Sequence, residues 1–111
     1  MFAFTILLKF KPNTDLDEMS KACNELLSII LSEKIPGLKS ANCYKNTAYG
    51  DTRPEWDYVY MALWDNKEAW ENSLSDKVNG PDAKRQREHK DLYDKLGSAV
   101  EKIIRFGSSI E

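Results

Sequence analysis

The sequence is poor in the residues that most metal and nucleophilic sites need. It contains one histidine and two cysteines, and Cys23 and Cys43 lie far apart with no CxxC pair. Neither a zinc site nor a redox motif is therefore predicted. No glycine-rich phosphate loop is present, and no Ser/His/Asp set can be assembled. We expect no metal, no cofactor and no nucleophilic mechanism.

Basic residues are not in excess either. Lysine and arginine number 16 against 18 aspartates and glutamates, which gives a formal net charge of −2. Proteins that bind nucleic acid usually carry a clustered basic surplus, so we expect no nucleic-acid partner. The most basic run, Lys84–Lys90, has Asp82 and Asp91 beside it. This mixture predicts a solvated helix face, with Arg85, Arg87 and Lys90 exposed and contact with an acidic substrate as their alternative.

Long apolar runs are absent. The opening segment 1–10 is apolar but short, it is cut off by Lys9 and Lys11, and no small-residue cleavage pattern follows it. It predicts neither a signal peptide nor a membrane span. The two cysteines are expected to be free, buried thiols, which fits a reducing cytoplasmic compartment. At 111 residues the chain predicts a single domain, 1–111.

Hydrophobic periodicity predicts the first half of the fold. Large apolar residues alternate from Phe2 to Phe10, which is typical of a strand. A helix with one broad apolar stripe follows, with Thr14 as its N-cap, and the sequence IPG at 35–37 ends it. Segment 38–48 mixes polar and apolar residues and predicts a less buried edge strand.

The second half repeats this arrangement. Segment 55–65 is apolar at almost every position and predicts a third strand, after which Asp65 or Asn66 caps a helix that begins at Lys67. The helix is expected to falter at 79–81 and to resume as one piece to Leu96. Segment 99–109 is the fourth predicted strand.

The resulting order βαββαβ predicts an α+β, ferredoxin-like fold with a four-stranded antiparallel sheet. Right-handed crossovers would place both helical segments on one side of this sheet and leave the other side bare. We expect Val59, Met61 and Leu63 to face the helices. The bare face would then carry two sets of residues, namely Trp56, Tyr58, Tyr60 and Trp64 together with Phe2, Phe4, Ile6, Leu8 and Phe10. Such a surface is too apolar for a monomer, so a homodimer is predicted in which two sheets close into a barrel.

Three stretches also resemble a known family. ILLKFKPNTD, IPGLKSANCYKN and WDYVYMALWDNKEAWENSL are similar to the dimeric α+β barrel superfamily, and most closely to its stress-responsive A/B barrel branch, which includes plant cyclases of the olivetolic acid type. The resemblance covers nearly the whole chain. It implies a pocket between sheet and helices or inside the barrel. Members include polyketide cyclases, cofactor-independent monooxygenases, haem-degrading enzymes and proteins without known activity.

The resemblance bears on three positions. Cyclase-like members carry a histidine early in the first strand, where this chain has Phe4, and a second histidine to which His89 corresponds. The haem-degrading members resemble this chain around Trp70. They also use an asparagine in the first strand and a histidine about ten residues after the tryptophan. This chain has neither, because His89 lies nineteen residues beyond Trp70.

From these patterns we predict a set of site residues, each with a structural alternative. His89 shares a helix face with Leu92 and Leu96, and histidine is the side chain whose ordinary pKa lies near neutrality. It is the predicted acid or base, together with Tyr60, although a helix-face histidine bonded to water fits the same pattern. The predicted substrate-binding residues are Phe4, Ile6, Trp56, Tyr58, Trp64, Trp70 and Tyr93, and packing in a dimer core is their alternative.

Three functions remain open on this basis. The first is a homodimer that binds a small apolar or aromatic molecule and acts on it by cyclase-type proton transfer. The second is a cofactor-independent monooxygenase, and the third is a non-catalytic, stress-related protein with a filled interior. A cavity of roughly 300 Å³ or more that touches His89 would favour an enzyme.

Overall fold

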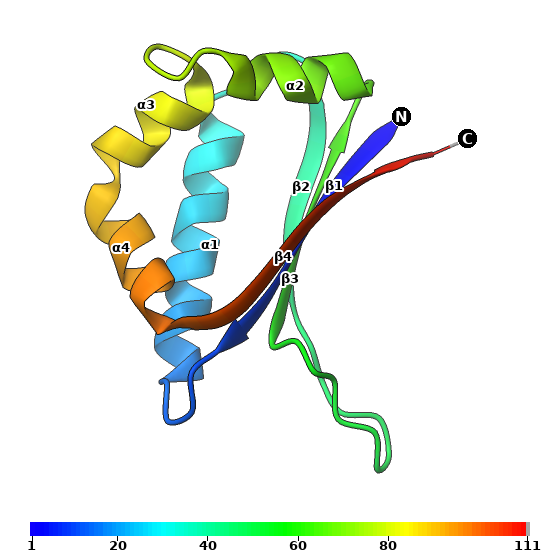
Figure 1. Cartoon of the computed structure of the whole chain (residues 1–111), viewed down its shortest axis with the longest axis vertical. Coiled ribbons are helices and arrows are strands. Elements are labelled where there is room, and N and C mark those ends of the chain that lie inside the picture. Colours follow the sequence, from blue (N-terminus) through cyan, green and yellow to red (C-terminus); the bar gives the residue numbers. More distant parts are fainter. Residues whose placement is uncertain (111) are drawn as a thin grey trace.

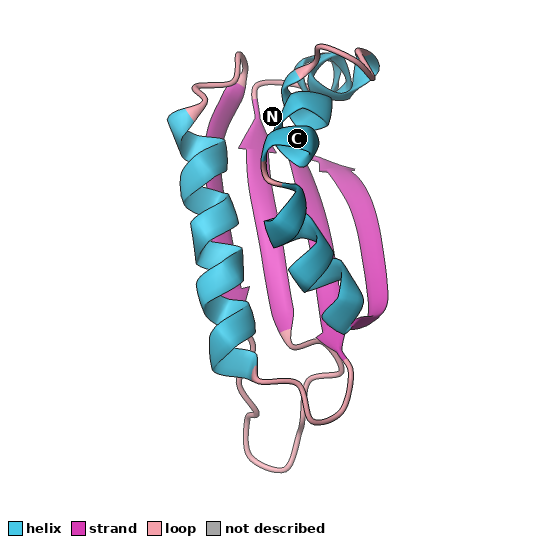
Figure 2. Ribbon diagram, turned by 90° about the vertical axis from the view of Figure 1, so that its left-hand side faces the viewer, coloured by secondary structure: helices cyan, strands magenta, loops and turns pink. Residues whose placement is uncertain are grey.

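The computed structural model describes residues 1–110. Four helices cover one side of a four-stranded antiparallel sheet whose strand order is β2-β3-β1-β4 (Figures 1 and 2). The elements are β1 (Phe2–Phe10), α1 (Leu16–Ser32), β2 (Leu38–Lys45), β3 (Tyr58–Trp64), α2 (Lys67–Ser75), α3 (Pro81–Glu88), α4 (Lys90–Ala99) and β4 (Val100–Ser109). The predicted ferredoxin-like fold is therefore confirmed.

Strand β1 and helix α1 form the centre of the molecule. β1 has the predicted bounds and pairs with both β3 and β4. α1 packs its apolar stripe on the sheet, and Met19, Ala22, Cys23 and Ile30 are its buried residues. Its N-cap is Asp15 rather than Thr14, because the Asp15 carboxylate accepts from the backbone N–H groups of Asp17 and Glu18, both at 3.1 Å. The Thr14 hydroxyl instead donates to the carbonyl of Lys11.

Strand β3 is shorter than predicted, because its first three predicted residues belong to a hairpin. Segment 46–57 continues the pairing of β2 and β3 beyond the sheet and projects away from the helices (Figure 1). The Asn46 side chain donates to the carbonyl of Trp56 at 2.8 Å, and Tyr49 bridges Thr52 at the tip. β2 is an edge strand, as expected.

The second helical region contains three helices. Asn66 caps α2 by accepting from the backbone N–H of Ala69 at 2.8 Å, which confirms one of the two predicted caps. The single helix expected from 81 to 96 is wrong, since it breaks at His89 into α3 and α4. His89 leaves helical geometry, with φ −122° and ψ 37°, and it ends α3 while its carbonyl begins the bonding of α4.

The sheet faces are the reverse of the prediction. Phe2 and Phe10 of β1 and Tyr58 and Trp64 of β3 are at most 5% exposed and belong to the two core clusters beneath the helices. Ala62, between the aromatic positions of β3, is fully buried and leaves room for the helices. Val59, Met61 and Leu63 therefore lie on the other face. The physical reason is the polarity of β1, whose even positions are all large and apolar whereas Thr5 and Lys9 stand at odd positions.

The face turned away from the helices stays apolar. Two cross-strand rows run over it, Tyr44–Val59–Leu7–Ile104 and Asn42–Met61–Thr5–Phe106. Met61, Ile104 and Phe106 are 38%, 44% and 43% exposed. Within residues 1–110 no element covers this outer face, and both views in Figures 1 and 2 show the helices on the opposite side. No helix in this part of the chain has the length and apolar character needed to cross a membrane.

Candidate functional site

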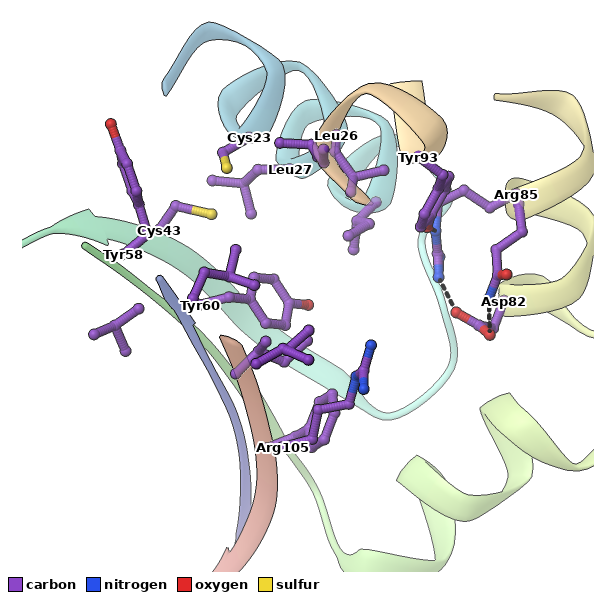
Figure 3. Close-up of a pocket in the computed structure, with 18 of the residues that line it drawn as sticks. Cys23, Leu26, Leu27, Cys43, Tyr58, Tyr60, Asp82, Arg85, Tyr93 and Arg105 are labelled. Carbon is purple, nitrogen blue, oxygen red and sulfur yellow. Dashed lines mark hydrogen bonds and ion pairs between the residues drawn. The ribbon is translucent and has the colours of Figure 1, made fainter. Parts of the chain in front are cut away.

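A cavity of about 580 Å³ lies between the sheet and the helices. The helix-facing side chains of all four strands form its floor, and α1, α2, α3 and α4 contribute its walls. Its lining is mostly apolar, with a few polar groups at the α3 and β4 sides (Figure 3). It exists because the helical region from α2 to α4 is broken into three pieces that bridge over the sheet instead of packing flat on it.

One end of the cavity is an aromatic wall. The Trp70 ring of α2 stands 5.1 Å from the ring centroids of both Phe2 and Phe4. Trp64 lies in the same core cluster, and its indole N–H is buried without a hydrogen-bond partner among the described residues. Aromatic faces of this kind favour flat, apolar ligands.

Two tyrosine hydroxyls are the polar groups in the middle of the cavity. The Tyr60 hydroxyl points into the open space (Figure 3) and makes no hydrogen bond within residues 1–110. Burial raises the pKa of Tyr60 to about 12 and also raises that of Tyr93. Both phenols are therefore neutral near pH 7 and are hydrogen-bond donors there. Tyr58 differs, since its hydroxyl donates to the carbonyl of Leu16 at 3.2 Å.

Arg85 holds the second of these hydroxyls in place. Its side chain is 7% exposed and reaches partners from three helical regions. Nε donates to Tyr93 Oη at 3.0 Å, Nη1 to Glu33 Oε1 at 2.7 Å and Nη2 to Asp82 Oδ1 at 3.3 Å. Since Tyr93 accepts from Arg85, its own hydroxyl proton remains free for another acceptor. The two carboxylates neutralise the guanidinium, as a buried charge requires.

The structure brings most of the predicted site residues together. Seven of them line the cavity, namely Phe4, Ile6, Tyr58, Tyr60, Trp64, Trp70 and Tyr93. Trp56 and His89 do not. Trp56 belongs to the projecting hairpin. His89 lies at the junction of α3 and α4, where it lines a separate surface depression with Glu25, Asp91 and Lys95. The cavity exceeds the predicted size but does not touch His89.

Sequence reasoning missed the charged residues of the cavity. Arg85 was expected to be exposed, yet it is 6% exposed and lines the cavity with Asp82. The sequence held no reliable signal for this, because a helical stripe from Arg85 through His89 to Leu92 assumes a continuous helix, and the helix breaks at His89. Arg105 also lines the cavity, from the helix-facing side of β4. The alternation of β4 placed it on a face but could not show that this face is hollow.

The cavity also contains two free thiols. Cys23 of α1 and Cys43 of β2 line it side by side (Figure 3). Burial, with a smaller contribution from Cys43, raises the pKa of Cys23 to about 12, and burial also raises that of Cys43. Both are thiols rather than thiolates near pH 7 and so are poor nucleophiles and poor metal ligands. Among residues 1–110 no cluster of three or more His, Cys, Asp or Glu side chains could hold a metal ion.

Comparisons with known proteins bear on the fold. No family model and no curated protein matches the sequence. Solved structures match over nearly the whole chain. A dabb family protein with a ferredoxin-like fold from Mesorhizobium loti is 12% identical, with a TM-score of 0.65, over 99% of this chain and 96% of that one.

Two further structures show the same likeness. A dimeric protein of unknown function with a ferredoxin-like fold from Bacteroides fragilis is 16% identical, with a TM-score of 0.64, over 98% of this chain and 95% of the other. A hydroxynitrile lyase from Passiflora edulis is 12% identical, with a TM-score of 0.65, over 99% and 93% of the two chains. The chain thus has the ferredoxin-like fold of these proteins, as the sequence predicts.

Proposed function

We propose that this protein is a homodimer in which each subunit binds a small, largely apolar molecule that carries an oxygen acceptor. The observation that supports this most directly is the cavity of about 580 Å³ with apolar walls and two neutral phenol hydroxyls. Its volume lies within the range of about 300 to 1,000 Å³ that is usual for ligand sites. A protein with a purely structural role would fill such a space with side chains.

The uncovered outer face supports the homodimer. Leu7, Val59, Ile104 and Phe106 form a continuous apolar surface on it, and a soluble monomer rarely exposes a large patch of this kind. A structure of the same fold, from Bacteroides fragilis, is described as dimeric. Two copies packed through their outer faces would form the predicted barrel and would leave both cavities on the outside, under the helices.

The unpaired thiols support the further proposal of a reducing, cytoplasmic compartment.

The donors in the cavity define the polar part of the ligand. Tyr60 and Tyr93 each offer one hydroxyl proton, and the pKa of Tyr60, about 12, keeps it protonated at any physiological pH. A carbonyl oxygen, or the enolate formed from it, is the acceptor that two such donors favour. The rest of the ligand would contact the Phe4 and Trp70 rings, which favour a flat, apolar body.

We infer proton transfer beside a carbonyl group as the reaction class. A hydrogen bond from Tyr60 strengthens as the carbonyl gains enolate character, so it lowers the barrier to transfer of a proton from the neighbouring carbon to a water molecule that acts as the base. The name of the Passiflora edulis protein shows that this fold carries an enzyme in at least one case. The prediction that His89 acts as acid or base stays a prediction, and the proposal here depends on Tyr60 alone.

Binding is tested first, with acetonaphthone as an aryl ketone probe. We expect quenching of Trp fluorescence on titration, because Trp64 and Trp70 line the cavity. Tyr60→Phe removes only the hydroxyl and should weaken binding about fivefold to tenfold, the value of one buried hydrogen bond. Tyr49→Phe is the matched control, since Tyr49 is 89% exposed in the hairpin. Equal affinities for wild type and Tyr60→Phe would refute the role of Tyr60.

Catalysis is tested separately with the same probe. In D₂O an enzyme of the proposed class should accelerate exchange of the methyl protons of acetonaphthone, as followed by NMR. Tyr60→Phe should reduce the rate by roughly 10² or more, the usual contribution of one oxyanion donor. Binding without exchange would identify a non-catalytic binding protein. Oxygen uptake with a naphthohydroquinone, which a proton-transfer enzyme should not show, would instead identify the monooxygenase.

A further inference from the structure

Arg105 is the one cavity-lining cation without a hydrogen-bond partner within residues 1–110, and it stands at the exposed side of the cavity, where its donors face water. It pairs with Ile6 across β1 and β4 and so stands on the helix-facing side of the sheet. Figure 3 shows its guanidinium rising from β4 toward the space beneath α3. No hydrogen bond or ion pair joins its side chain to any described residue, whereas Lys102, on the same strand, pairs with Glu55.

Arg85, the second cation that lines the cavity, differs from Arg105 because its nitrogens have hydrogen-bond partners. Nε, Nη1 and Nη2 of Arg85 donate hydrogen bonds to Tyr93, Glu33 and Asp82, respectively. Asp82 is equally committed, because its second oxygen accepts from Gln86 Nε2 at 2.8 Å. With two carboxylates around one guanidinium, the Arg85 cluster therefore offers an anion no net positive charge. Arg105 is therefore the cation of the cavity that has no carboxylate beside it among the described residues.

The strand register places Arg105 in line with Tyr60. Ile6 of β1 is opposite Tyr60 on one side and opposite Arg105 on the other. Neighbouring strands lie about 4.8 Å apart, so the backbones of Tyr60 and Arg105 are about 10 Å apart on one face of the sheet. Ile6 forms an apolar floor between them. One ligand of moderate size can therefore reach both side chains.

From this row we propose that Arg105 is an anion subsite, and that the ligand is a monocarboxylic acid with a flat, apolar body. The inference rests on the proposed function and specifies its ligand. A guanidinium matches the two oxygens of a carboxylate, which it binds through paired N–H donors. A single negative charge is favoured over a phosphate dianion, because the cavity offers one free cation and already contains the carboxylate of Asp82. The body would lie over Ile6, with a second oxygen near the Tyr60 hydroxyl.

Three naphthalene probes test the charge that the subsite selects. Naphthoic acid and naphthamide share shape and carbonyl but differ in charge, and naphthyl phosphate adds a second charge. Calorimetric titration of the wild-type protein at about pH 7 should show naphthoic acid binding about tenfold tighter than naphthamide. Arg105→Gln should reduce this ratio to within about twofold, because the affinity for naphthoic acid falls more than that for naphthamide. Arg53→Gln, in the exposed hairpin, is the matched control and should retain the wild-type ratio.

Each other outcome is decisive. If naphthamide binds as tightly as naphthoic acid, or if Arg105→Gln keeps the wild-type ratio, the subsite is refuted while the cavity remains a binding site for neutral molecules. If naphthyl phosphate binds tighter than naphthoic acid, the preference for a single charge is wrong. If none of the probes binds and acetonaphthone does not bind, the proposed function fails and the subsite fails with it.

Discussion

At the scale of single residues, Arg85 is the side chain whose loss should cost the most stability. It is 7% exposed and links α3 to Glu33 at the end of α1 and to Tyr93 of α4. Arg85→Ala leaves Glu33 and Asp82 without their cation. Removal of one partner of a buried pair costs about 3 to 5 kcal/mol, and the partial exposure of these carboxylates places the expected loss near 2 to 3 kcal/mol. Urea denaturation monitored by circular dichroism measures it.

The matched control for this prediction is a double substitution. Glu33→Leu combined with Arg85→Met removes both members of the shorter ion pair and retains much of their packing volume. We expect it to recover at least half of the stability that Arg85→Ala loses, because apolar replacements of buried pairs are often neutral. A double variant as unstable as Arg85→Ala would show that packing, rather than an uncompensated charge, is responsible.

The buried titratable groups lower the stability of the folded protein at alkaline pH. Burial raises the pKa of Cys23 from 9.0 to about 12 and that of Tyr60 from 10.0 to about 12. The unfolded chain loses these protons near the ordinary values, so above about pH 9 it holds fewer protons than the folded protein. Stability should be complete below that pH and fall as the pH rises toward 12.

The slope of this loss can be measured in urea under reducing conditions. One group that is deprotonated only in the unfolded state contributes about 1.4 kcal/mol per pH unit. Between about pH 9 and pH 10 Cys23 and Cys43 both contribute, because burial raises the pKa of each thiol from 9.0, and Cys23→Ala should have a smaller slope there. If Cys23→Ala keeps the wild-type slope, the loss of stability at alkaline pH is due to other groups.

Single residues also mark the limit of what the sequence could predict at the site. Seven of the nine predicted residues line the cavity, because the period of a strand places Phe4, Ile6, Tyr58, Tyr60 and Trp64 on one face together. The period of a helix grouped His89 with Leu92 and Leu96 on the assumption of one continuous helix. The break at His89 invalidates that assumption, and it is Arg85, a charged residue, that reaches the interior.

At the scale of elements, the packing of β4 against β1 depends on Gly107. A Cβ built at this position would lie 2.1 Å from Phe2 Cζ, so Gly107→Ala must displace the ring that packs on Trp70. Overpacking of this kind costs about 1 to 3 kcal/mol. The same change should also perturb the aromatic wall and weaken acetonaphthone binding. Thermal denaturation and fluorescence titration measure the two effects.

Gly97 of α4 provides the contrast. A Cβ there meets nothing within 4 Å, and the residue is exposed and helical. Gly97→Ala should therefore stabilise the protein by about 0.5 to 1 kcal/mol through helix propensity and a less flexible unfolded chain. If both alanine variants shift the melting temperature in the same direction, the close contact between Gly107 and Phe2 is not the cause of the first effect.

The order of the elements was predicted correctly from the sequence, but the sheet face that meets the helices was not. Segment 58–64 is apolar on both faces, so its own pattern cannot show which one meets the helices. β1 contained the missing signal. Its even positions carry only large apolar residues, whereas Thr5 and Lys9 stand at odd positions. The more polar set should face away from the core, which is the arrangement that the structure has.

At the scale of the whole molecule, the reversal of the two sheet faces does not weaken the argument that a second copy binds. It changes which residues would form the dimer interface. The predicted aromatic face is already covered by helices, and the proposed interface would instead use the rows through Val59 and Met61. The two cavities then lie on opposite sides of the dimer and are independent. Ligand binding should accordingly follow a single-site isotherm with two equal sites per dimer.

The interface predicts that charge on the outer face separates the subunits. Met61→Glu and Ile104→Glu would each place two unpaired carboxylates in a dyad interface, since every substitution appears twice. Desolvation of such groups costs several kcal/mol, so we expect dimer affinity to fall at least 100-fold, as measured by sedimentation equilibrium. Val78→Glu is the control, because Val78 is 65% exposed in the loop between α2 and α3, away from the outer face. A wild-type protein that sediments as a monomer at micromolar concentration would contradict the dimer, and the apolar rows on the sheet would then need another partner.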